Sequence, residues 1–188
     1  MSRSVVRALC AGILLLLAAA AVGCDGGNQP SAVEWRNVTV PLPDGWYLFE
    51  EADTRLSISN QDIGPEALRE DTTPDTDEPV VAMFFTYEPT TLPDDWRRYV
   101  DEQDATLEVD DRLELDGEVP ATRLVFSYVT DDVPLREMVV VIPSRSIVVL
   151  SQPVPSVGDT TGPDVFLDHV ETFMQVLDNA SFGAPVLD

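Results

Sequence analysis

The feature that most constrains the fold is a series of strand-like segments in the second half of the chain. Asp116-Gly117 separates two of them, Thr106–Leu115 and Val119–Val129. An Asp-Gly pair between two such segments is the strongest short-range signal of a β-hairpin. Two further segments follow across polar turns, at Leu135–Ile142 and Ile147–Leu150. The pattern predicts four consecutive antiparallel strands between Thr106 and Leu150.

The part of the chain between Trp35 and Tyr87 also favours strands. Alternating or continuous apolar residues predict an opening strand through Trp35, Val38 and Val40, then strands at Trp46–Phe49, Arg55–Ser59 and Val80–Tyr87. The segment from Gln61 to Glu78 is polar, acidic and rich in Pro, which favours a long mobile loop with at most a helical turn at Glu66–Arg69.

Two segments have helical periodicity. Leu92–Gln103 has Pro93 and two Asp residues in its first turn, where they suit the positive end of the helix dipole. Pro163–Leu177 repeats apolar residues at spacings of three and four. With the strands, these helices predict an α+β fold in which helices flank a central antiparallel sheet, an α/β/α sandwich.

The N-terminal segment has the composition of a secretory signal. Arg3 and Arg7 precede an uncharged apolar run, Leu9–Val22, and then Ala21-Val22-Gly23-Cys24. A Cys directly after small residues resembles the bacterial lipobox, in which the thiol is lipidated, although Ala21 replaces the preferred Leu. The alternatives are simple secretion and an uncleaved membrane helix, for which a run of about 14 residues falls short of the roughly 20 required.

This segment sets the expected domain boundaries. Residues 1–23 form a lipoprotein signal peptide, 24–33 a flexible tether, 34–182 a single domain and 183–188 a tail. Cys10 is removed with the signal and Cys24 carries lipid, so the predicted domain has no disulfide and no thiol nucleophile. We expect an extracytoplasmic protein anchored to the cell membrane through Cys24, since two acyl chains hold a protein stably on a bilayer.

Charge excludes some partners. The chain carries 34 acidic residues against 11 Arg and has no Lys, for a net charge of −23. Nucleic acid requires a cationic surface, so we expect no nucleic-acid partner. Schiff-base chemistry requires a Lys and is excluded. A solubilising acidic surface is the favoured interpretation of this charge.

The order of segments resembles the PsbP-like superfamily, which includes DcrB-type and LpqN-type bacterial lipoproteins. The resemblance rests on Val40-Pro41-Leu42-Pro43-Asp44-Gly45-Trp46, the turn Leu115–Arg123 and the terminal helix with Asp178-Asn179-Ala180-Ser181-Phe182. It covers about Val38 to Phe182. The resemblance implies a PsbP-like fold and an accessory role in the envelope, and it carries no shared catalytic residues to this chain.

Candidate chemical groups each have a structural interpretation. His169 is the only histidine, and we expect it to be structural because no serine elbow or other triad partner accompanies it. Adjacent Asp pairs such as Asp110-Asp111 favour turn or helix-end roles over catalysis, since glycosidases place two carboxyls across a cleft. The acidic stretch favours a solvated loop, with a calcium site as the alternative; its carboxylates are Glu70, Asp71, Asp75, Asp77 and Glu78.

The large aromatic residues favour a core over a ligand groove. They are Trp35, Trp46, Trp96, Phe84, Phe85, Phe126, Phe166 and Phe173. We therefore expect no catalytic residues, no cofactor and no metal site. The leading hypothesis is a non-enzymatic, lipid-anchored accessory protein that binds a protein partner or an envelope lipid. The alternatives are a carboxylate-based cell-wall hydrolase and a calcium-responsive module.

Overall fold

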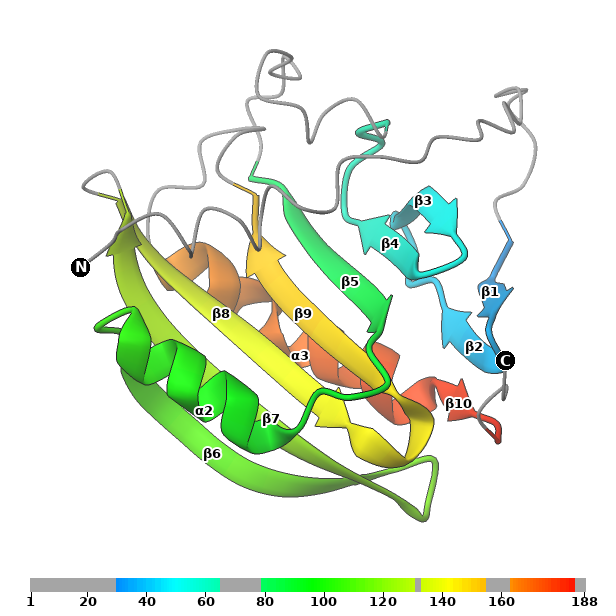
Figure 1. The fold of residues 1–188 in the computed structure, drawn as a ribbon. Coiled ribbons are helices and arrows are strands. Elements are labelled where there is room, and N and C mark those ends of the chain that lie inside the picture. The colour runs from blue at the N-terminus through cyan, green and yellow to red at the C-terminus, as the bar shows by residue number, and fades with distance from the viewer. Residues whose placement is uncertain (1–29, 65–78, 131–132, 155–162, 185–188) are drawn as a thin grey trace.

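A seven-stranded antiparallel sheet dominates the molecule (Figure 1). The fold is that of a computed structural model, which describes residues 30–64, 79–130, 133–154 and 163–184. Across the sheet the strands follow the order β3 (Tyr47–Ala52), β4 (Arg55–Ser59), β5 (Val81–Tyr87), β9 (Ile147–Pro153), β8 (Val133–Ile142), β7 (Val119–Thr130) and β6 (Thr106–Leu115). Every neighbouring pair is antiparallel.

The predicted series of four antiparallel strands is confirmed. Strands β6, β7, β8 and β9 pair consecutively. The β6–β7 turn places Asp116 at φ 47° and Gly117 at φ 73°. Two successive positive φ angles are the requirement of a type I′ turn, and Asp and Gly are among the residues that best tolerate them. The short helix η2 (Pro143–Arg145) joins β8 to β9.

The predicted single opening strand is wrong. Residues 32–41 form a hairpin of two strands, β1 (Ala32–Trp35) and β2 (Val38–Pro41), because Arg36 and Asn37 turn the chain at φ 46° and 61°. The hairpin begins two residues before the predicted domain start. Strand β10 (Ser181–Phe182) pairs with β2 and completes a separate three-stranded sheet.

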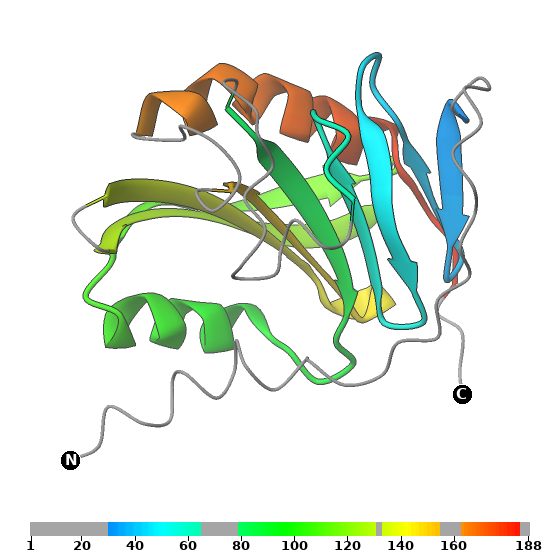
Figure 2. The same cartoon turned by 90° about the horizontal axis from the view of Figure 1, so that it is seen from above.

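Two helices lie on opposite faces of the large sheet (Figure 2). Helix α3 (Pro163–Asn179) buries Phe166, Phe173 and Leu177 against one face. Helix α2 (Pro93–Glu102) buries Val100 against the other. Among the described residues, neither helix is long and apolar enough to cross a membrane.

The central strands are buried on both faces, which explains their continuous apolar sequence. In β8, Met138, Val140 and Ile142 belong to the core under α3. The alternating residues Val139 and Val141 belong to the core under α2. The middle of the sheet therefore separates two apolar layers, with one helix over part of each face.

The predicted α/β/α sandwich is wrong, because the protein is mostly β. Strands hold 51% of the structure and helices 22%. A seven-stranded sheet is about 30 Å wide, whereas one helix is about 10 Å in diameter. Helix α2 contacts β6 and β7, whereas the main contacts of α3 are with β2, β5, β8 and β9. The remaining layer at one side of the large sheet is the three-stranded sheet of β1, β2 and β10, and not a further helix (Figure 1).

Candidate functional site: a groove beside helix α3

The position of α3 leaves a hollow over the outer strands of the sheet. Phe166 and Phe173 hold the helix over the middle of the sheet, where they form a tilted ring pair with centroids 5.7 Å apart. Trp46 packs edge-on against Phe173 at 6.0 Å. Since the main contacts of α3 are with β2, β5, β8 and β9, the same face of β7 lies beside the helix.

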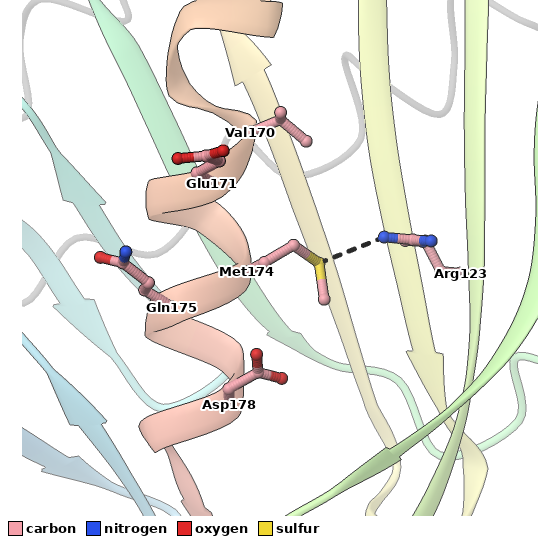
Figure 3. A pocket seen from close by; sticks show the side chains of 6 residues that line it. All are labelled: Arg123, Val170, Glu171, Met174, Gln175 and Asp178. Atoms are coloured by element: carbon pink, nitrogen blue, oxygen red, sulfur yellow. Dashed lines mark hydrogen bonds between the residues drawn. The ribbon is translucent and has the colours of Figure 1, made fainter.

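The hollow is a shallow groove, widely open to solvent, with a volume of about 380 Å³. We call it the α3 groove and define it by the residues that line it: Arg123, Val170, Glu171, Met174, Gln175 and Asp178. Figure 3 shows Met174 extending from the helix toward Arg123, which comes from strand β7. Val170 and Met174 are half-buried and pack against the main core, so the groove has an apolar wall that is continuous with it.

Arg123 is held in place by strand β6. Its Nε and Nη2 atoms donate to the two carboxylate oxygens of Asp111, at 3.0 and 2.6 Å. This fork is the most specific geometry for an Arg–carboxylate pair. Its Nη1 atom faces the Met174 sulfur at 3.6 Å. Because a thioether is only a weak acceptor, Nη1 retains the capacity to donate to an oxygen atom of a ligand.

The rim of the α3 groove is negative. Glu171 and Asp178 are exposed on the helix, and the charge of Arg123 is already balanced by Asp111. The four groups together carry a net charge of −2 at neutral pH. The arrangement can bind a ligand that combines an apolar group, a hydrogen-bond acceptor and positive charge.

The predicted structural role of His169 agrees with its position. Its Nδ1 atom lies 2.9 Å from the backbone oxygen of Val165, and its ring lies 6.4 Å from that of Phe173. The aromatic residues belong to the cores, as the sequence favours, and none of them lines the α3 groove.

The predicted turn or helix-end role of Asp110 and Asp111 is wrong, because both lie within strand β6 and point to opposite faces of the sheet. Asp110 accepts two hydrogen bonds from Arg97 of α2, each of 2.7 Å, whereas Asp111 binds Arg123 in the groove. The hydrogen bonds from Arg97 hold the pKa of Asp110 below its ordinary value. The two carboxyls are therefore structural anchors, and their side chains cannot act together on one substrate.

Several predicted residues lie outside the described residues. These are the lipidation site Cys24 and the carboxylates Glu70, Asp71, Asp75, Asp77 and Glu78. Within the described part of the chain, no group of three or more His, Cys, Asp or Glu side chains is placed to hold a metal ion.

Sequence reasoning missed Arg123 and Met174. A signal for Arg123 was available, because it alternates with Ala121 and Val125, both buried, and so occupies an inward-facing position of a strand. Met174 follows Val170 at a spacing of four and is easily taken for core. What distinguishes it is the position of α3 on the sheet, which a local pattern does not encode.

A second unexpected group lies on the opposite face. Glu137 of β8 is buried with an exposed fraction of 8%, and the Tyr128 hydroxyl donates a hydrogen bond to it. Burial raises the pKa of Glu137 to about 7, against the smaller lowering effect of the hydrogen bond from Tyr128. The α3 groove and this carboxyl are separated by the sheet, so they form no common site.

Comparison with known proteins gives little functional information. No known protein family matches the chain, and no curated protein resembles it in sequence. One similar solved structure is that of PA94, a protein of unknown function from Pseudomonas aeruginosa. It is 12% identical with a TM-score of 0.44, over 84% of this chain and 97% of that one. The resemblance to the PsbP-like superfamily stays a prediction.

Proposed function

We propose that this protein is a non-enzymatic module of the bacterial cell envelope, anchored to the outer face of the membrane through Cys24, that binds a protein partner in the α3 groove. The observation that carries the proposal is the groove itself. It combines an apolar wall with an Arg whose Nη1 faces only a weak acceptor, and it contains no nucleophile paired with a base.

Charge favours a protein over a phospholipid as the partner. Anionic headgroups would meet the carboxylates of Glu171 and Asp178 before reaching Arg123, whose charge Asp111 already balances. Protein surfaces supply the required combination of cationic, apolar and backbone carbonyl groups. An envelope lipid is therefore the less favoured ligand.

The geometry gives no support to the hydrolase alternative. A glycosidase needs two carboxyls that face each other across the bound sugar. Glu171 and Asp178 instead lie on one wall, seven residues apart along the same helix, which is a rise of about 10 Å. The calcium alternative concerns residues 70–78, which lie outside the described residues, and we do not propose it.

Photocrosslinking in isolated membranes tests this function. A photoreactive residue at position 174 should give a discrete, protease-sensitive product, because the partner covers the α3 groove. The matched control places the same residue at Glu102, which is exposed at the end of α2 on the other face of the sheet, and should give no such product.

Other crosslinking results would contradict binding of a protein in the α3 groove. A product at position 174 that survives protease and extracts with lipid would make a lipid the ligand. Equal products from positions 174 and 102, or none from position 174, would contradict binding in the α3 groove.

A further inference from the structure

We propose that the α3 groove recognises a short basic segment of the partner, in which cationic side chains flank an apolar one. This inference rests on the proposed function and specifies the chemistry of its ligand. It is carried by three features of the groove: its length, its unpaired carboxylates and its single oriented guanidinium.

The length of the groove sets the size of the segment. Among the residues that line the groove, Val170, Met174 and Asp178 lie on one helix face at spacings of four. From Val170 to Asp178 the helix rises about 12 Å. An extended chain covers that distance with about four residues, so the groove fits a segment of about that length. The exposed Leu167, one turn before Val170, extends the apolar strip beyond the groove.

The carboxylates on this face have no cationic partner. Among the described residues, Asp94, Asp95, Asp110 and Asp111 each pair with an Arg. Neither Glu171 nor Asp178 forms an ion pair or side-chain hydrogen bond within the same part of the structure. A cationic ligand at these two carboxylates would therefore displace no internal partner, and both lie beside an apolar strip.

The spacing of these acids is within reach of two long cationic side chains on an extended segment. The acids are about 10 Å apart along the helix, whereas alternate residues of an extended chain are about 7 Å apart, and the length of the Lys or Arg side chains covers the difference. Two Lys or Arg side chains can then reach Glu171 and Asp178 while an apolar side chain between them contacts Val170 and Met174. Charge complementarity of this kind favours specificity and fast association.

Arg123 adds a contact to the peptide backbone. Its fork with Asp111 fixes the guanidinium, and Nη1 points toward Met174 at the middle of the groove (Figure 3). A backbone carbonyl in the groove is a better acceptor than the Met174 sulfur and would replace it. The guanidinium thus orients the segment, whereas the carboxylates select its charge.

Methyl NMR of the full chain in zwitterionic nanodiscs tests the inference. The probes are acetyl-Lys-Leu-Lys-Leu-Lys-amide and acetyl-Glu-Leu-Glu-Leu-Glu-amide. The Lys peptide should shift the Met174 methyl signal saturably, and the Glu peptide should not. Met83 and Met138 are fully buried and serve as internal references whose signals should stay constant.

A charge-matched pair of variants locates the binding. The double variant Glu171→Gln/Asp178→Asn should weaken binding of the Lys peptide about tenfold, as expected for the loss of two exposed ion pairs. Asp101→Asn/Glu102→Gln removes the same charge from the end of α2 and should change the affinity by less than about twofold, since those residues lie across the sheet.

Specific results would overturn the inference. Equal binding of both peptides, or an unchanged affinity in the groove variant, would show that the carboxylates do not select charge. A shift of the Met174 signal on adding anionic lipid to the nanodiscs, without peptide, would make lipid the occupant. A crosslink from position 174 together with failure of the Lys peptide would leave the proposed function intact and refute only this ligand chemistry. Binding of the Lys peptide without a crosslink from position 174 would instead support the ligand chemistry and contradict the proposed function.

Discussion

Glu137 places a titratable group inside an apolar layer. Phe126 is its cross-strand neighbour on β7, Val139 belongs to the same core, and Tyr128 donates a hydrogen bond to its carboxylate. Burial raises its pKa to about 7 from an ordinary 4.5. The folded state therefore binds this proton more tightly than the unfolded state, and the resulting stabilisation is complete below pH 4.5 and lost as pH rises through 7.

Glu137→Gln should remove this pH dependence. The amide keeps the shape and can still accept from Tyr128, but it does not titrate. The difference in free energy of unfolding between wild type and variant should shift by about 3 kcal/mol in favour of the variant between pH 4 and pH 8. Urea unfolding at both pH values measures it. A constant difference would contradict a buried carboxyl with a raised pKa.

Gly117 tests the turn that organises the sheet. It holds φ 73°, and a Cβ at this position would meet nothing within 4 Å. Gly117→Ala should therefore cost about 1 kcal/mol through backbone strain alone. Urea unfolding of Gly117→Ala beside Glu118→Ala, an exposed neighbour, provides the measurement. Equal stability of the two variants would refute the strain argument.

At the scale of elements, α2 is attached by the buried Val100, by the aromatic side chains of Trp96 and Tyr99 and by an ion-pair network. Val100 has 1% of its surface exposed, whereas Arg97 bridges Asp110 of β6 and Asp94 of its own helix. The pKa of Asp110 is lowered by the hydrogen bonds from Arg97, so the attachment is present at neutral pH and persists below the ordinary Asp pKa before it is lost in acid.

Arg97→Ala should loosen α2 without unfolding the sheet. Exposed ion pairs contribute at most about 1 kcal/mol, which corresponds to roughly fivefold faster amide exchange in the helix. Arg98→Ala removes only the pair with Asp95 and should have a smaller effect. Hydrogen exchange followed by NMR compares the two variants. Equal exchange rates would mean that Arg97 does not anchor the helix.

Helices and strands that depend on interactions between residues close together in the sequence could be predicted from it. The Asp116-Gly117 hairpin, the doubly buried strands β8 and β9 and the periodic helix α3 each have a signal within about 15 residues. The β1–β2 hairpin was missed because Arg36 and Asn37 adopt positive φ without a glycine. The second sheet depends on pairing of β10 with β2, about 140 residues apart, which no local pattern reports.

At the scale of the whole molecule, the α3 groove exists because one helix covers only part of a wide sheet. The residues that line it come from α3 and β7, about 50 positions apart, so sequence could identify Arg123 as an inward-facing cation but not its partner Met174. The proposed anchor at Cys24 would hold this groove near the membrane.

Cys24→Ser should release the protein from the membrane without altering its stability. The described fold begins at β1, and none of its core residues lies near Cys24 in sequence. Carbonate extraction and fractionation measure the release, and urea unfolding serves as the control. A variant that stays in the membrane fraction would contradict lipid anchoring through Cys24.

The most direct measurement of the central claim is competition for the α3 groove. Membranes that carry the photoreactive residue at position 174 are irradiated with increasing acetyl-Lys-Leu-Lys-Leu-Lys-amide, or with its Glu counterpart. Our account predicts that the Lys peptide abolishes the protein crosslink and that the Glu peptide leaves it unchanged. A crosslink that persists at saturating Lys peptide, or that both peptides remove equally, would contradict an acidic groove that docks a basic segment.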